Sequence, residues 1–119
     1  MTKQRFDNHS TEFGLWLRSQ HDIDSKLGFA TTNIDYLWKN TKTGNWMLIE
    51  EKRYMAKPSW SQKELFKVIH KSCLSSKKYH GIHLIQFEKT SPEDGKVYLN
   101  GKLITNSELI NFLQFKEAP

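Results

Sequence analysis

An apolar run that ends abruptly in charged residues constrains this chain more than any other feature. Residues 46–49, Trp-Met-Leu-Ile, lead directly into Glu50, Glu51, Lys52 and Arg53. The run has no helical period and contains aromatic and β-branched residues, so it predicts a buried β-strand. Side chains alternate faces along a strand, so Glu50 and Lys52 share one face and Glu51 and Arg53 share the other. Charges at the end of a buried strand are costly unless they are paired or bind a metal, which makes this strand end a candidate site.

The composition predicts one globular domain over residues 1–119, since the chain is 119 residues long and 37% hydrophobic. No apolar run approaches the ~20 residues that span a membrane, and the N-terminus has no apolar signal core. The single cysteine, Cys73, excludes an internal disulfide and fits a reducing cytoplasm, where we expect the protein to be located. The net charge of +5 favours nucleic acid as the partner.

The hydrophobic pattern predicts a small α/β domain with a mixed sheet and helices packed on it. The expected order is a helix, two or three strands, a helix, a strand, a hairpin and a last helix. The first helix begins at Ser10 or Thr11, with Glu12 in its first turn, and the last is capped by Asn106 or Ser107. The predicted strands, hairpin included, are residues 29–32, 33–40, 45–54, 82–87 and 97–104.

The second helix is predicted from a capping box that can be placed in two registers. Its apolar side is expected to pack on the sheet, while Lys63 and Lys67 lie on another side at i, i+4 spacing. Such lysines form either a solvated helix face or a phosphate-binding face. The two registers are Ser61 with Glu64, and Ser59 with Gln62.

Asp35 lies in the middle of the strand expected to pair with the apolar run. Pairing that is symmetric about the turn at 41–45 places Asp35 opposite residues 50–52, so Asp35, Glu50 and Lys52 converge. Two carboxylates this close raise each other's pKa unless a divalent cation lies between them. Oxygen ligands suit Mg²⁺, or Mn²⁺ in its place. A neighbouring lysine can orient a water or neutralise charge on a phosphate, so the group suits phosphodiester hydrolysis.

These residues resemble the PD-(D/E)xK nuclease superfamily: Asp35, a gap of 14 residues through a hairpin, then Glu50-x-Lys52 at the end of an apolar strand. Over residues 10–88 the chain looks like the branch that contains virus-type replication-repair nucleases and archaeal-type Holliday junction resolvases. The proline of the family's name is absent, because Asn33 and Ile34 precede Asp35. The segments that carry the likeness to this branch are 49–52 (IEEK), 60–65 (WSQKEL) and 81–85 (GIHLI).

The resemblance implies a restriction-endonuclease-like fold: a mixed β-sheet flanked by helices, with an αβββαβ core at about residues 10–88 and a C-terminal hairpin and helix at 89–119. It implies a catalytic Lys52 supported by Gln62. The implied Mg²⁺ ligands are Glu12, Asp35, Glu50 and the backbone carbonyl of Glu51. The expected contacts to DNA phosphates are Arg53, Lys57, Lys63 and Lys67.

The predicted function is metal-dependent cleavage of DNA, directed by DNA structure because the chain has no room for a separate DNA-reading domain. Junction cleavage needs two active sites, so a homodimer is expected by analogy, with residues 89–119 as the interface. Three alternatives stay open: an inactive subunit that binds nucleic acid, a protein-interaction or inhibitor module, and a plain surface salt bridge at the motif. A shifted motif, Glu51-x-Arg53, would put an arginine where the chemistry needs a titratable lysine.

Overall fold

The computed structural model describes residues 12–23 and 25–116, and the chain forms two compact units, residues 1–31 and 32–119. In the first unit, α1 (Glu12–Ser19) has Glu12 in its first turn, as predicted. Two short 3-10 helices follow, at His21–Ile23 and Ser25–Leu27. The predicted caps Ser10 and Thr11 lie outside the described residues.

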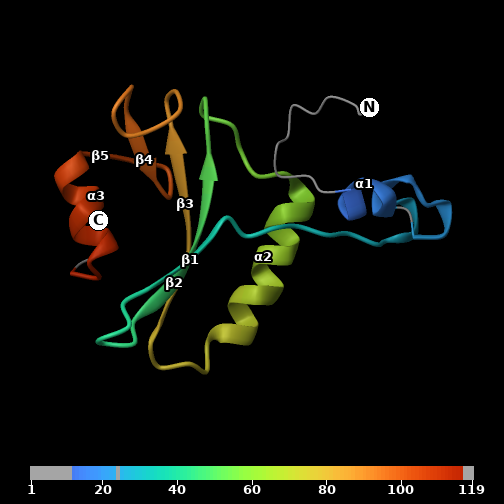
Figure 1. Ribbon diagram of the computed structural model, residues 1–119, viewed down its shortest axis with the longest axis horizontal. Coiled ribbons are helices and arrows are strands. Elements are labelled where there is room, and N and C mark those ends of the chain that lie inside the picture. Colours follow the sequence, from blue (N-terminus) through green and yellow to red (C-terminus); the bar gives the residue numbers. More distant parts are fainter. Residues whose placement is uncertain (1–11, 24, 117–119) are drawn as a thin grey trace. The chain divides into compact units, whose positions relative to one another are not determined.

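The second unit is a mixed α/β fold built on a five-stranded sheet with the spatial order β1-β2-β3-β4-β5 (Figure 1). Strands β2 and β3 are parallel and are joined through α2, and the other neighbours are antiparallel. The predicted mixed sheet is therefore confirmed. The elements are β1 (Tyr36–Lys39), β2 (Trp46–Lys52), α2 (Trp60–Cys73), β3 (Tyr79–Phe87), β4 (Val97–Leu99), β5 (Lys102–Ile104) and α3 (Asn106–Leu113). No helix among the described residues is long and apolar enough to cross a membrane.

The chain before the hairpin contains less strand than predicted. Residues 29–32 form no strand, so two strands rather than three precede α2, and β1 begins only at Tyr36. Asp35 therefore lies one residue before β1 and not in the middle of a strand. Its side-chain Oδ2 accepts a hydrogen bond from the backbone N–H of Glu51 at 2.8 Å. At this point a side chain, and not a backbone ladder, joins the segment to β2.

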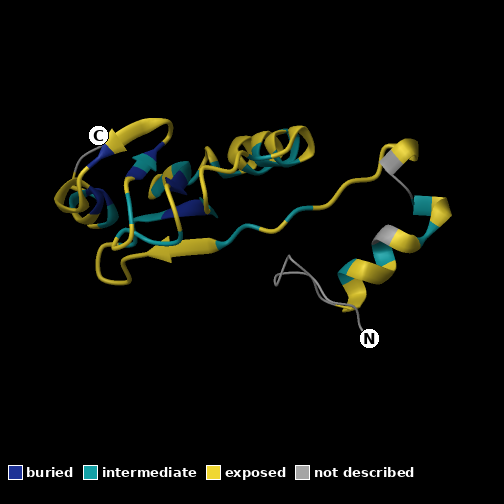
Figure 2. Ribbon diagram, turned by 90° about the horizontal axis from the view of Figure 1, so that it is seen from above, coloured by how far each residue is buried: buried dark blue, intermediate teal, exposed yellow. Residues whose placement is uncertain are grey.

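The two faces of β2 pack against different helices. Met47 and Ile49 lie in an apolar core with Leu109 and Phe112 of α3. Glu50 is buried on the other face, so α2 and α3 cover opposite faces of the sheet, as Figure 1 shows. α3 contains two buried residues whereas α2 contains none (Figure 2). Glu50 and Lys52 therefore face the side of the sheet that α2 covers, and α2 contains no buried residue.

The start of α2 uses the second of the two predicted registers. Ser59 is the N-cap: its Oγ accepts from the backbone N–H of Gln62 at 3.1 Å, and Gln62 Oε1 accepts from the backbone N–H of Ser59 at 3.0 Å. This reciprocal pair begins the helix at Trp60 and holds the Gln62 side chain at the helix start. The last helix is likewise capped by Thr105 with Glu108, one residue before the predicted Asn106.

The predicted Asn-Gly hairpin is confirmed between β4 and β5. Asn100 and Gly101 have φ values of 52° and 87°, as a two-residue hairpin turn requires. Asn100 also anchors the turn to the sheet, since its Oδ1 accepts from the backbone N–H of Leu84 at 2.9 Å. The hairpin therefore continues the sheet beyond β3.

Candidate active site

The β1–β2 hairpin brings two acidic residues to one strand end. The register pairs Tyr36 with Ile49, so the next pair outward is Asp35 with Glu50. The observed register agrees with pairing symmetric about the turn as far as Tyr36, and it places Asp35 next to the 50–52 region. Fourteen residues of sequence separate Asp35 from Glu50, and the hairpin brings the Asp35 carboxylate to the end of β2, where it accepts a hydrogen bond from the backbone N–H of Glu51.

Glu50 is a buried carboxyl group with a perturbed pKa. The residue is 4% exposed. Burial raises the pKa of its carboxyl, repulsion by Asp35 raises it further, and Lys52 together with the Asp35 backbone partly opposes these effects. Its Oε1 is buried and has no hydrogen-bond partner among the described residues. A buried acceptor without a hydrogen bond costs about 1–3 kcal/mol of folding free energy. No described residue offsets this cost for Glu50 Oε1.

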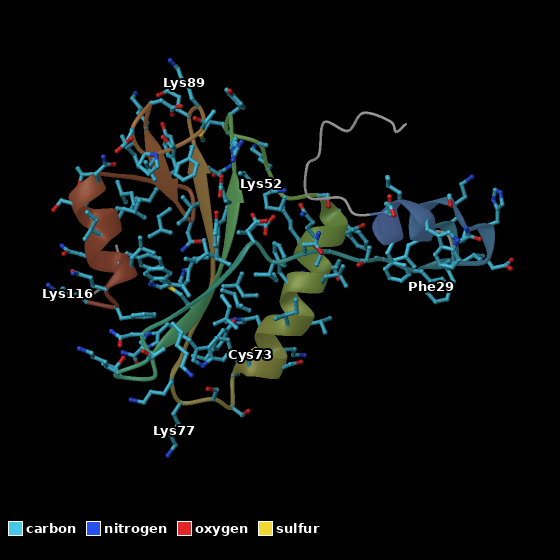
Figure 3. All side chains as sticks on the ribbon, viewed as in Figure 1. Phe29, Lys52, Cys73, Lys77, Lys89 and Lys116 are labelled. Carbon is cyan, nitrogen blue, oxygen red and sulfur yellow. The ribbon has the colours of Figure 1, made fainter. Side chains whose placement is uncertain are left out.

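Lys52 lies between Glu50 and the start of α2. Its Nζ is 3.5 Å from Glu50 Oε2 and donates to Gln62 Oε1 at 3.1 Å. Gln62 Nε2 in turn approaches Glu50 Oε2 at 3.5 Å. Figure 3 shows Lys52 beside the N-terminal end of α2. The three predicted residues therefore form one polar group that joins the strand to the helix.

Glu51 and Arg53 lie on the opposite face of β2, as the strand alternation predicted. Arg53 Nε is 3.2 Å from Glu51 Oε2, and the Tyr36 hydroxyl donates to Glu51 Oε1 at 3.0 Å. This hydrogen bond raises the pKa of Tyr36. The shifted motif therefore corresponds to a surface ion pair away from Glu50. The predicted phosphate contact by Arg53 and the metal role of the Glu51 carbonyl stay predictions.

A pocket of about 310 Å³ opens beside Glu50 between α2 and β3. Lys63 and Lys67 of α2 line it together with Glu50, so two of the predicted phosphate contacts share a concave surface with the buried carboxylate. Lys67 also pairs with Glu64 at 3.2 Å. Lys57 is exposed in the segment that leads into α2. The basic side chains around this pocket would attract a polyanion.

The donor atoms at the end of β2 suit a hard divalent cation. Asp35, Glu50 and the backbone carbonyl of Glu51 offer oxygen only, which is the set that Mg²⁺ and Mn²⁺ prefer. Within the described ranges, no group of three or more His, Cys, Asp or Glu side chains gathers to hold a metal. Of the predicted ligands in the second unit, only Asp35 and Glu50 would contribute a side chain. Glu12 belongs to the first unit, and its role as a ligand stays a prediction.

Gln86 is a residue of this region that the sequence reasoning missed. It is 6% exposed, lies beside Lys52 in the β2–β3 register, and donates from Nε2 to the carbonyl of Ala56 at 2.9 Å. The available signal was a polar side chain between Ile85 and Phe87 in an apolar strand. Gln86 therefore ties the segment that follows the motif to the sheet.

The chain turns sharply after the motif. Tyr54 and Met55 have φ values of 55° and 58°, in the left-handed region that side chains disfavour. Their backbone N–H groups donate to the carbonyls of Lys89 and Phe87, both at 2.9 Å. These bonds hold a conformation that costs of order 1 kcal/mol or more per residue. The turn directs the chain from the end of β2 to the start of α2.

Comparison with known proteins does not assign this chain to a family. No protein-family model matches it, and no curated protein or solved structure matches it. The resemblance to PD-(D/E)xK nucleases therefore stays a prediction from the motif, and function is inferred from the residues at the end of β2.

Proposed function

We propose that this chain is a metal-dependent DNA endonuclease with a restriction-endonuclease-like fold that hydrolyses phosphodiester bonds at the end of β2. One observation carries the proposal: Glu50 Oε1 is buried without a hydrogen-bond partner among the described residues, next to a second carboxylate and an amine. A divalent cation at this point would satisfy that oxygen and relieve the repulsion between Asp35 and Glu50.

The side chains have distinct roles in this proposal. Asp35, Glu50 and the Glu51 carbonyl would hold Mg²⁺ or Mn²⁺. When bound, the cation supplies electrostatic stabilisation of the charge that develops on the phosphoryl oxygens. The Lys52 ammonium has three N–H donors, and its contacts to Gln62 and Glu50 engage two of them. The third can orient the attacking water or donate to the phosphate.

The position of the site within the sheet supports the proposal. In open α/β sheets, ligands bind beyond the carboxyl ends of the strands. Glu50 and Lys52 lie at the carboxyl end of β2, which is parallel to β3, and α2 begins beside them. The net charge of +5 and the lysines of the pocket suit DNA. We propose branched or junction DNA as the substrate.

We also propose a homodimer, because cutting both strands of a branched DNA requires two active sites. The C-terminal hairpin and helix leave apolar side chains in solvent: Leu103 is 52% exposed and Ile110 is 57% exposed. Strand β5 is an edge of the sheet, and edge strands are surfaces on which further chains pair. These features support residues 89–119 as the interface.

The test is cleavage of supercoiled plasmid and of a synthetic four-way junction in Mg²⁺, in Mn²⁺ and in EDTA. We expect nicking with either cation and none in EDTA. Lys52→Ala should lower the rate by about 10²–10⁴-fold, the contribution of a positioned acid–base group. Asp35→Ala should also lower the rate strongly, because it removes a proposed ligand of the cation. Lys42→Ala is the control, because Lys42 is exposed in the turn at 41–45 and is not among the residues that line the pocket. Cleavage that persists in both site variants, or that is absent with both cations, contradicts the proposal.

Two other outcomes would assign the alternatives. Salt-sensitive DNA binding without cleavage would make the chain a binding subunit that keeps the fold without the activity. The absence of both binding and cleavage would leave a protein-interaction or inhibitor module, in which the charges serve only the surface.

A further inference from the structure

Trp60, the first residue of α2, is far more exposed than a tryptophan with a structural role. Its exposed fraction is 75%. Trp38 is anchored by a hydrogen bond from Nε1 to the Leu113 carbonyl at 2.7 Å, and Trp46 packs against Tyr79. The Trp60 indole has no hydrogen bond or ring contact with any part of the chain that the structure describes. A single exposed aromatic is ordinary, so the neighbours of Trp60 decide whether it has a role.

Three exposed lysines lie on the same side of α2 as Trp60. At 100° per residue, positions 60, 63, 67 and 71 fall within about 80° of the helix surface. They extend over roughly 16 Å along the helix axis. Lys63, Lys67 and Lys71 are all exposed. We call these four residues the Trp60 stripe.

The Trp60 stripe begins in the helix turn that contacts the proposed active site. Gln62, two residues after Trp60, accepts the hydrogen bond from Lys52. Lys63 and Lys67 line the pocket that also contains Glu50. A chain that lies along the stripe would therefore run from the buried carboxylate outward along α2.

We infer that the Trp60 stripe binds unpaired nucleotides, with a base stacked on the Trp60 ring and phosphates on the lysines. The inference rests on the proposed nuclease function for its substrate class. Single strands are bound by cations that follow the backbone and by aromatic rings on which bases stack. A duplex offers its phosphates but hides its base faces, so it would use the lysines without Trp60. A protein partner fits the stripe poorly, because lysine is depleted at protein interfaces.

Such a stripe would give the enzyme its preference among DNA structures. Branch points, frayed ends and flaps contain unpaired bases next to duplex, whereas plain duplex does not. The bond placed at the end of β2 would then be the one that adjoins the unpaired segment. Trp60 would act as a specificity residue and not as a catalytic one.

The test is equilibrium binding in EDTA, where no cleavage occurs, of fluorescein-labelled oligothymidylate of about 20 nucleotides and of a duplex of the same length. Loss of one base stack should weaken single-strand binding by Trp60→Ala about 5- to 150-fold, while duplex binding stays within about 2-fold. Trp60→Phe should restore most of the affinity. Val68→Ala is the matched control, since Val68 is 61% exposed on α2 outside the stripe. A parallel oligouridylate titration shows whether the unpaired strand is DNA or RNA.

A second measurement tests the inference without Trp60→Ala, in case that variant does not fold. Stacking on Trp60 should quench the intrinsic fluorescence of the wild-type chain when oligothymidylate is added, and Trp60→Phe should abolish that quenching. Unchanged single-strand binding by Trp60→Ala, an equal loss on single strand and duplex, or quenching that persists in Trp60→Phe overturns the inference.

The inference and the nuclease proposal fail separately. If Trp60→Ala weakens single-strand binding but the chain cuts no DNA with Mg²⁺ or Mn²⁺, the nucleotide-binding role of the stripe stands and the nuclease proposal is wrong. If the chain cuts DNA but Trp60→Ala binds single strands as tightly as the wild type does, the nuclease proposal stands and the binding role of the stripe is wrong.

Discussion

Lys52 Nζ donates a hydrogen bond to Gln62 Oε1 at 3.1 Å, and the same oxygen accepts from the backbone N–H of Ser59 at 3.0 Å. One side-chain oxygen therefore both caps α2 and holds the ammonium group at the end of β2. The start of the helix and the proposed catalytic lysine are coupled through this atom, which makes Gln62 a positioning residue.

Gln62→Ala should lower the cleavage rate by about 10- to 100-fold, the effect usual for residues that orient the groups of a site. The loss should appear in kcat rather than in KM, because Gln62 positions Lys52 and does not bind DNA. Ser59→Ala is the matched variant, since it removes the other half of the capping box and does not contact Lys52. Both variants should lose about 0.5–2 kcal/mol of stability in urea unfolding. Equal activity of the two variants would remove the positioning role.

Glu50→Gln should make the protein more stable at about pH 8. Burial raises the pKa of Glu50 above its value in the unfolded chain. The folded state therefore holds the proton more tightly, and the stability from this group is present at low pH and lost as pH rises through the folded pKa. Glutamine removes that loss. The gain in melting temperature should shrink as pH falls toward the ordinary glutamate pKa of 4.5. A gain that is independent of pH contradicts this account.

Magnesium should stabilise the wild-type protein and not the Glu50→Gln variant. A ligand that binds only the folded state stabilises it by about 1.4 kcal/mol at ten times its dissociation constant. The buried Glu50 oxygen and Asp35 are the proposed ligands, so the variant should show little change. Thermal unfolding in a Mg²⁺ titration, with Ca²⁺ and NaCl at equal ionic strength as comparisons, measures the effect. The same shift in both proteins would place the cation elsewhere.

The lysines of the pocket should set the salt dependence of DNA binding. Each phosphate contact contributes about 0.9 to the slope of log K against log salt for duplex and about 0.7 for single strands. Lys63→Gln with Lys67→Gln should therefore reduce the slope by about 1.8 or 1.4. Lys42→Gln with Lys77→Gln removes the same charge from exposed positions outside the pocket, and it should leave the slope nearly unchanged. An equal change in both double variants would indicate only a net-charge effect.

Sedimentation of the wild-type chain should show a dimer. Leu103→Glu with Ile110→Glu places two charges on the proposed apolar interface, and this double variant should sediment as a monomer with unchanged far-UV circular dichroism. Val68→Glu serves as the control, because Val68 is equally exposed but lies on α2. A wild-type monomer at concentrations well above those of the cleavage assay contradicts the homodimer.

Local signals in the sequence predicted most of the second unit correctly. The apolar run is β2, the Asn-Gly pair is the turn between β4 and β5, and the turn at 41–45 gave the β1–β2 register. Each of these depends on near neighbours in the chain, which the sequence shows directly. The strand expected at 29–32 was wrong because β-propensity is weak unless a partner strand pairs with it.

The choice between two capping boxes at α2 also lay beyond the sequence. Ser61 with Glu64 and Ser59 with Gln62 have the same spacing, and either satisfies the local rule. The observed pair leaves Gln62 Oε1 free to accept from Lys52 as well. The two registers are equivalent by the local rule, but only the observed one places Gln62 in the capping box, where it also contacts Lys52 of β2.

By itself, the sequence determined that Glu50 and Lys52 share one face of a strand while Glu51 and Arg53 share the other, because alternation is a local property of extended backbone. Only the tertiary structure decided that Glu50 Oε1 is buried without a partner among the described residues, and that Gln62 bridges Lys52 to α2. Burial and bridging depend on how α2 packs over the sheet, and that packing brings together side chains whose spacing along the chain does not specify their contact.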